Sequence, residues 1–204
     1  MEASNLGLIG RIWRALARPS SRFALGTLLA AGVILGGLGV IAFDATMHAT
    51  STDEFCVSCH ELEVNALAEF VGTPHHTNAS GKVASCSDCH VPREFVPKMI
   101  RKVRAVGEIY HHVLGTIDTP EKYDEHRMWM ANKTWAYMNA RDSQECRNCH
   151  DVNSWDLALQ SEKAQKYHAE ALSRGKTCID CHKGLAHKLP AGIEEDAQIE
   201  GIDF

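Results

Sequence analysis

The chain has 204 residues, enough for one or two domains, and its 21 basic and 26 acidic side chains give a net charge of −5. Hydrophobic residues make up 45 % of the sequence, a proportion typical of a folded domain. The basic residues do not alternate with aromatic residues in a stripe, so the composition argues against nucleic acid as a partner.

The first predicted element is a membrane anchor at residues 23–43. This uncharged run would form a helix about 32 Å long, which is enough to cross the hydrocarbon core. A cleaved signal peptide would have a shorter apolar region followed by an A-x-A-like site, and neither is present. Arginines precede the run and acidic residues follow it. The positive-inside rule therefore predicts a cytoplasmic basic arm at residues 1–22 and a periplasmic location from about residue 44 onward.

A short link, residues 44–55, leads to the pentapeptide C-x-x-C-H, which occurs four times and contains all eight cysteines. Two thiols with this spacing match the two vinyl groups of one porphyrin, and the adjacent histidine can reach the iron, so the motif indicates covalent c-type haem. Zinc knuckles, redox dithiols or disulfides do not require a histidine after every second cysteine. The predicted attachment cysteines are Cys56, Cys59, Cys86, Cys89, Cys146, Cys149, Cys178 and Cys181, and the predicted proximal iron ligands are His60, His90, His150 and His182.

Helical patterns dominate the segments between the motifs. Residues 72–81 form a predicted loop, because they are rich in Gly, Pro, Asn and Ser. Apolar residues recur with helical spacing over 96–114, and we interpret the basic residues in its first half as a solvated face, with binding of phospholipid or haem propionates as the alternative. A second helix opens at Pro120 and runs to about residue 140. A third is expected over residues 156–174, before a glycine.

The predicted fold is therefore mainly α, with one N-terminal transmembrane helix and a small helical multihaem domain over residues 44–192. An acidic tail, residues 193–204, is expected to be frayed. About 160 exported residues leave little chain for an apolar core, so we expect the four porphyrins to serve as the core. The spacing of the motifs suggests two haem pairs separated by a longer helical insert.

Eight histidines remain as candidates for the sixth position on each iron, where a second histidine gives a closed, low-potential electron carrier. His168 shares a helical face with small and apolar residues, as an inward-pointing ligand would. His187 is too close to His182 to reach the far side of the same haem, so it is expected to serve another. The remaining candidates are His48, His75, His76, His111, His112 and His126.

The chain resembles the NapC/NirT/NrfH family of membrane-anchored tetrahaem quinol dehydrogenases over about residues 11–190. Besides the single anchor, the resemblance is carried by residues 55–61, His75 with the N-x-S-G that starts at Asn78, and residues 89–92, 115–122, 145–150 and 175–190.

The resemblance implies three haems with two histidine ligands each and one unusual haem near the membrane, where quinol is oxidised. Matched position by position, the distal iron ligands would be His75, His168 and His187. The histidines outside this pattern are His48, His76, His111 and His126.

Two departures from the family pattern concern the first haem. Many members have a methionine two residues after the first motif, where this chain has Leu62, which cannot bind iron. His60 is then the favoured ligand, with Met47 as a weaker candidate. Members also carry a lysine near the quinol, and His112 stands at about that position. Asp118 would be the carboxylate beside the first haem, with helix capping as its alternative role.

The favoured function is transfer of electrons from the membrane quinone pool to a periplasmic reductase, in nitrate, nitrite or similar respiration, by a protein of the bacterial inner membrane. Quinol would be the substrate, and Asp118 and His112 would accept its protons. The first alternative is the same electron path run in reverse, as a quinone reductase fed by a periplasmic cytochrome. The second is a terminal reductase that reduces nitrite at an open haem. Its expected assemblies are a homo-oligomer or a complex with the redox partner.

Overall fold

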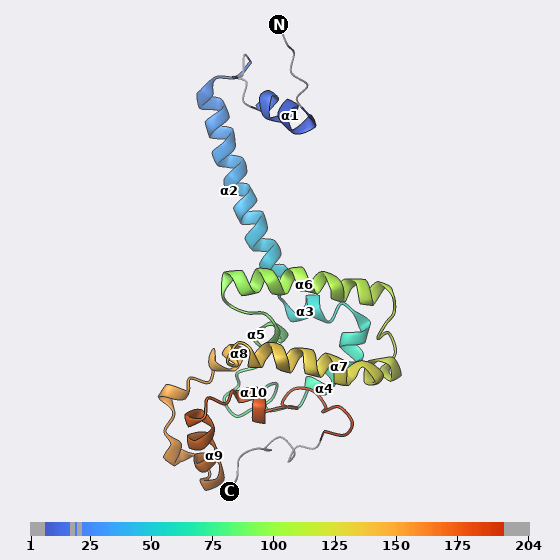
Figure 1. Ribbon diagram of the computed structural model, residues 1–204, viewed down its shortest axis with the longest axis vertical. Helices are drawn as coiled ribbons and strands as arrows, with labels where there is room; N and C mark the ends of the chain where they lie inside the picture. The colour runs from blue at the N-terminus through green and yellow to red at the C-terminus, as the bar shows by residue number, and fades with distance from the viewer. Residues whose placement is uncertain (1–6, 17–18, 20–21, 194–204) are drawn as a thin grey trace. The chain divides into compact units, whose positions relative to one another are not determined.

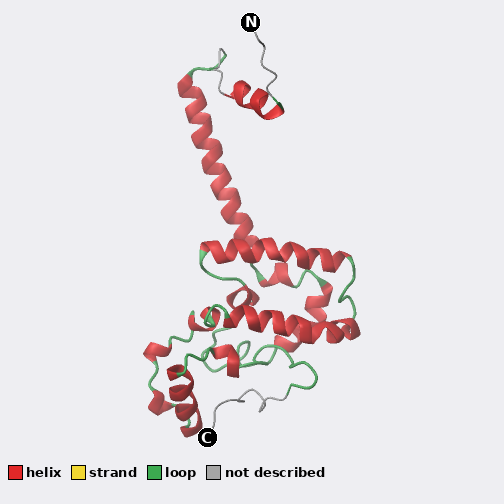
Figure 2. Cartoon of the chain, viewed as in Figure 1, coloured by secondary structure: helices red, strands yellow, loops and turns green. Residues whose placement is uncertain are grey.

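The computed structural model describes residues 7–16, 19 and 22–193, and the chain divides into two units, Met1–His48 and Ala49–Phe204. Within the described residues the regular elements are all helices, joined by loops and turns, and no strand occurs (Figure 2). The prediction of a mainly α fold is therefore confirmed. Of the predicted tail, only the first residue belongs to the described part.

The first unit consists of α1 (Leu8–Leu16) and nearly all of α2 (Leu25–Ala49). Among the described residues, α2 is the one helix long and apolar enough to cross a membrane, and none of its side chains is buried. The helix continues past the predicted end at residue 43, because one carboxylate does not stop a helix whose later turns are well bonded. The Thr46 hydroxyl, for example, donates to the Ala42 carbonyl at 2.7 Å. Only three residues, 50–52, separate α2 from the next helix.

The second unit has three longer helices, and a set of short ones that carry or adjoin the haem motifs (Figure 1). The longer ones are α6 (Phe95–Val113), α7 (Pro120–Asn139) and α9 (Glu162–Ser173). The short ones are α3 (Asp53–Cys56), the π-helix η1 (Leu62–Leu67), α4 (Ala68–Phe70), α5 (Cys86–His90), α8 (Gln144–Arg147), the 3-10 turns η2 (Val152–Ser154) and η3 (Leu157–Leu159), and α10 (Cys178–Cys181).

The predictions of α6 and α7 are confirmed to within a residue, but α9 begins later than expected. The Asp156 carboxylate caps the separate turn η3 by accepting from Ala158 N at 3.0 Å. Ser161 then starts the helix by accepting from Ala164 N at 3.3 Å. Two successive N-caps therefore divide a segment that looks continuous in its periodicity.

Two of the haem motifs start helices with a capping box, which explains the residues around their cysteines. In α5 the cap is Ser85 and its reciprocal partner is Asp88; in α10 they are Thr177 and Asp180. Each acidic residue stands just before the second cysteine of its motif and accepts from the main-chain N–H of the cap, at 3.0 and 2.7 Å. The box satisfies free N–H groups at the helix start and holds both cysteines in one turn.

Polar bridges join the motif helices to one another. Asp53 in α3 accepts from Cys86 N at 2.8 Å, which joins the first motif to the second. The hydroxyl of Ser143, which is completely buried, accepts from Ile179 N at 3.1 Å and joins the third to the fourth. Arg141 pairs with both Glu94 and Glu145, which ties the segment after the second motif to the helix of the third.

The chain by itself makes a very small apolar core. Among the described residues, the buried hydrophobic side chains are Tyr123, Met138 and Ile179, each 8 % exposed. They lie where α7 packs against α10 and η1. Such a core is far smaller than a domain of this length normally builds, so its organisation depends on groups bound to the four motifs.

Candidate functional site

Four of the eight motif cysteines come together in two pairs. Cys56 of the first motif and Cys86 of the second are within hydrogen-bonding reach, and this contact lowers the pKa of Cys56 to about 7 while it raises that of Cys86. Cys146 of the third motif and Cys178 of the fourth repeat the arrangement, with the pKa of Cys178 lowered to about 6. Groups attached to these sulfurs would therefore lie close together, the first motif's beside the second's and the third's beside the fourth's.

Three motif histidines each face one of the remaining histidines. Two imidazoles that hold one iron, each at about 2 Å, have ring centroids about 6 Å apart. The three observed separations fit that value, so the residues present fit haem iron. The pairs are His75 with His150 at 6.2 Å, His187 with His90 at 6.2 Å, and His168 with His182 at 5.9 Å.

The pair formed by His168 and His182 lines a cavity of about 320 Å³ together with Cys178 and Cys181. Gln160 binds Nδ1 of His168 at 2.7 Å, which orients the ring and leaves Nε2 for a metal. Burial lowers the pKa of His182, reinforced by His168, so its ring is neutral as a ligand must be. Both thiols and both imidazoles needed for one haem therefore border the same space.

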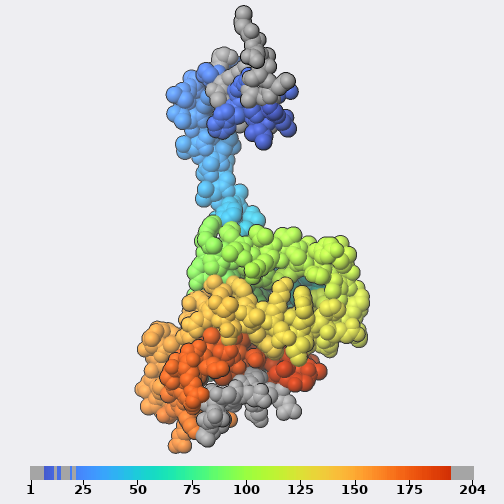
Figure 3. Space-filling view, in the orientation of Figure 1, coloured from blue at the N-terminus to red at the C-terminus, as the bar shows by residue number. Residues whose placement is uncertain are grey.

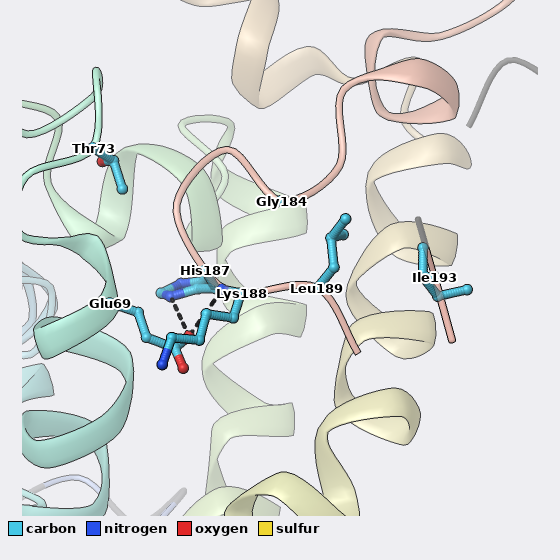
Figure 4. A pocket seen from close by; sticks show the side chains of 7 residues that line it. All are labelled: Glu69, Thr73, Gly184, His187, Lys188, Leu189 and Ile193. Atoms are coloured by element: carbon cyan, nitrogen blue, oxygen red, sulfur yellow. Dashed lines mark hydrogen bonds and ion pairs between the residues drawn. The ribbon is translucent and has the colours of Figure 1, made fainter. Parts of the chain in front are cut away.

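The pair formed by His187 and His90 depends on a buried ionic cluster, of which Figure 4 shows Glu69 beside His187 and Lys188. Glu69 accepts both branches of the Arg127 guanidinium at 2.6 and 2.9 Å, and it also accepts from Lys188 N at 3.0 Å. Its carboxylate lies 4.0 Å from His187 Nδ1. The cluster thus anchors the loop on which His187 stands. Desolvation, together with His187, lowers the pKa of His90 to about 4, which keeps that ring neutral.

His75 stands in the predicted loop over residues 72–81, which the structure confirms. Asn78 closes the loop by donating to the carbonyls of Pro74 and Lys82, both at 2.8 Å. The Nδ1 atom of His75 is buried without a hydrogen-bond partner, an arrangement that costs free energy in an unliganded histidine. The signal for this pairing is absent from the local sequence, because His150 follows 75 residues later.

The surroundings of His60 differ from those of the other motif histidines. The Glu61 carboxylate, 5 % exposed, lies 3.2 Å from His60 Nδ1 and accepts from His112 Nδ1 at 2.6 Å. The His60 and His112 rings are 6.2 Å apart, but both turn Nδ1 toward the same carboxylate rather than facing across a gap. Nε2 of His60 lies 3.1 Å from the Asp118 carbonyl. This centre is polar and partly open.

Asp118 lies beside this centre, held by Lys122, which binds its carboxylate at 2.7 Å and the Gly115 carbonyl at 3.0 Å. The hydrogen bond from Lys122 lowers the pKa of Asp118. The alternative role of Asp118 as a helix cap is wrong, since the cap of α7 is Thr119, whose hydroxyl accepts from Lys122 N. Gly115 has φ +62°, and a Cβ there would lie 2.6 Å from the Asp118 carboxylate.

Leu62, at the position of the family's methionine, and Met47, the weaker candidate for an iron ligand, lie in different elements. Leu62 opens the π-helix η1, in which the buried Asn65 donates to the Glu61 carbonyl at 2.8 Å. π-Helical turns are rare and often mark functional sites. Met47 lies in the last turn of α2, in the other unit, and its role stays a prediction. Three histidines outside the pattern are held by local hydrogen bonds: His76 by Thr77, His111 by Thr116 and His126 by the Lys122 carbonyl.

Sequence reasoning missed three charged residues of these sites. Glu61 could have been found, because a carboxylate directly after a motif histidine is an unusual neighbour for a metal ligand. Glu69 and Arg127 gave no signal, since they are 58 residues apart and their pairing depends on the approach of α7 to the segment after η1.

Residues 18–192 match the family described as "NapC/NirT cytochrome c family, N-terminal region". The chain is 49 % identical to the cytochrome c-type protein NapC of Escherichia coli (strain K12), over 90 % of this chain and 92 % of that protein. It is 44 % identical to the denitrification system component NirT of Stutzerimonas stutzeri, over 92 % and 93 %. It is also 42 % identical to the cytochrome c-type protein TorY of Escherichia coli O157:H7, over 88 % of this chain and 48 % of TorY. No solved structure is significantly similar to the chain.

Proposed function

This chain belongs to the NapC/NirT cytochrome c family, and from that premise we propose that it takes electrons from membrane quinol and passes them to a periplasmic reductase. Its four attachment motifs identify it as a tetrahaem c-type cytochrome. Bound haem supplies one-electron transfer, which converts a two-electron donor in the membrane into a source of single electrons.

We assign the iron ligands from the paired imidazoles. Each motif histidine is the proximal ligand of its own haem, and His75, His187 and His168 are the distal ligands for the third, second and fourth motifs. Their ring separations, the lowered pKa values of His90 and His182 and the buried Nδ1 atom of His75 support this assignment. Paired thiols place neighbouring motifs in contact, which favours rapid electron transfer along the chain of haems.

The observation that carries the proposal is the different environment of the first motif. Here the two imidazoles 6.2 Å apart, those of His60 and His112, both turn Nδ1 to the Glu61 carboxylate, and the Asp118 carbonyl lies 3.1 Å from His60 Nε2. The motif also follows the anchor helix α2 by only six residues. A lipid-soluble donor can therefore reach this centre, whereas the other three are closed by histidine pairs.

Quinol oxidation needs groups that accept two protons, and we place His112 and Asp118 in this role. Glu61 binds Nδ1 of His112, which orients the ring and leaves Nε2 to bind a quinol hydroxyl. Asp118, held by Lys122, lies beside the His60 ring near Nε2, whereas Glu61 and His112 lie near Nδ1. Its carboxylate can accept the proton of the second quinol hydroxyl.

The remaining assignments follow from the family and the charge pattern. We propose an inner-membrane location with residues 1–22 in the cytoplasm, the anchor after them and the haem domain, to about residue 192, in the periplasm. A reductase for nitrate, nitrite or a similar compound would be the partner. The relative from Stutzerimonas stutzeri, which is named as a denitrification component, supports this class of partner.

The test is oxidation of a quinol analogue by membranes that contain the haem-loaded protein, followed at the haem absorption bands. We expect rapid reduction of the haems, and oxidation on addition of the partner reductase. Reduction by a periplasmic cytochrome together with formation of quinol would instead favour the reverse direction. Turnover of nitrite by the purified protein alone would favour a terminal reductase.

A further inference from the structure

Helix α6 lies at the edge of the second unit (Figure 3), and many of its apolar side chains are exposed. Val103 is 73 % exposed and Val113 is 76 % exposed. The outward residues recur at intervals of three, four and seven, so they lie on one side of the helix. They are Val96, Ile100, Val103, Val106, Tyr110, Val113 and Leu114, all exposed. This is a longer apolar stripe than a soluble monomer normally exposes.

The opposite, polar side of α6 is the one that contacts the protein. Arg101 donates to the His90 carbonyl at 3.0 Å, and His112 donates to Glu61 at 2.6 Å. Lys102 lies at the edge of the stripe, four residues before Val106, and donates to the carbonyl and the hydroxyl of Thr50 at 2.6 and 2.9 Å. A surface helix in water has the reverse arrangement, with its apolar side inward. The haem motifs lie on the polar side, so bound haem does not cover the stripe.

The contact of Lys102 with Thr50 indicates that the membrane covers the apolar stripe. Thr50 directly follows Ala49, the last residue of α2, the helix suited to cross a membrane. The apolar run of the anchor ends at residue 43, so Thr50, about 10 Å of helix further on, lies at the level of the lipid headgroups, and Lys102 holds the middle of α6 at that level. The helix carries four basic residues and one acidic residue, Glu108, which is paired with Arg101. A cationic helix with one apolar side at this depth has the properties of an interfacial helix on anionic lipid.

We propose that α6 lies in the membrane interface, with its apolar stripe among the lipid acyl chains and the basic residues of its flanks, Lys98 and Arg104, at the headgroups. The second unit then has two membrane attachments, the anchor and this helix, which together restrict its orientation. Because His112 belongs to α6 and binds Glu61, the first haem motif is brought to the same surface. The proposal depends on α2 as an anchor and does not require quinol to be the substrate.

The test is photo-cross-linking of the full-length, haem-loaded protein in vesicles of phosphatidylethanolamine and phosphatidylglycerol. p-Benzoylphenylalanine replaces Val103 or Val113 in separate variants. Leu35 in α2 is the lipid-facing reference, and Leu159 in η3, 86 % exposed, is the control for an exposed apolar residue outside the stripe. After illumination, mass spectrometry measures lipid adducts on the protein.

We expect adduct yields at Val103 and Val113 close to that at Leu35 and about tenfold above that at Leu159. A yield at the two α6 positions no higher than that at Leu159 would overturn the proposal. Cross-links from Val103 or Val113 to a second copy or to a reductase would also overturn it, and would identify the stripe as a protein interface. Quinol oxidation is measured in a separate assay. A protein that fails to oxidise quinol would still give the same lipid cross-linking result.

Discussion

Replacement of Arg127 by glutamine should weaken both the fold and the ligation at the second motif. Arg127 is 12 % exposed and Glu69 is 8 % exposed, and the two form a bidentate pair. Glu69 also accepts from Lys188 N, next to His187, so the pair holds the loop of a proposed iron ligand. The Arg127→Gln variant leaves the Glu69 carboxylate buried without its cation.

The expected size of the effect follows from this burial. Loss of one partner from a buried, bidentate ion pair costs about 3–5 kcal/mol. Arg127→Lys keeps the charge but not the planar fork, so it should cost less, about 1–3 kcal/mol. The pair between Glu170 and Arg174 is more exposed and lies within one helix, and Glu170→Gln should cost about 0.5 kcal/mol at most.

Two measurements check this reasoning on the haem-loaded protein in detergent. Denaturant titration gives the free energy of unfolding, and electron paramagnetic resonance reports whether each ferric iron keeps two histidine ligands. We expect Arg127→Gln to lose stability in the order given and to lose one low-spin signal, which Arg127→Lys retains in part. If Arg127→Gln matches Glu170→Gln in stability and keeps every low-spin signal, the anchoring role of the cluster is refuted.

Three further predictions concern the first motif and the capping boxes. His112→Ala should lower the rate of quinol oxidation about 10²-fold with unchanged haem content, and unchanged quinol kinetics would dismiss its role as a proton acceptor. Gly115→Ala should lower kcat/KM for quinol about tenfold, because the new methyl group displaces the Asp118 carboxylate; Gly81→Ala, at φ +70° with open space around it, should leave kcat/KM as it is. Asp88→Asn should destabilise the protein by about 1 kcal/mol at neutral pH. Hydrogen bonds from the cap of α5 lower the pKa of Asp88 below its ordinary 3.8, so this contribution is present above that pH and disappears as the pH falls through the lowered value. Denaturation curves of the two proteins should therefore converge in acid, and a constant difference would contradict the assignment.

The sequence predicts those features of this fold that depend on local pattern. The anchor is predicted by its uncharged run, and α6 and α7 are predicted by helical patterns. The attachment cysteines and proximal histidines are predicted by the C-x-x-C-H motif itself. The pairing of imidazoles does not follow, because His75 and His187 meet motif residues far away in the chain. The end of α2 was also missed, since helical hydrogen bonds continue past Asp44 where hydropathy falls. Contacts that depend on packing, such as that of Glu69 with Arg127, are not predicted by the local sequence.

The adjacent thiols of Cys56 and Cys86, and those of Cys146 and Cys178, have a consequence for biogenesis. Two thiols in contact, one with a lowered pKa, form a disulfide readily in an oxidising compartment. Folding ahead of porphyrin attachment would therefore disable two motifs with each bond formed. We expect protein made without a haem-attachment system to contain Cys56–Cys86 and Cys146–Cys178 disulfides, detectable by peptide mapping, and maturation to need a reductant that acts before the domain closes.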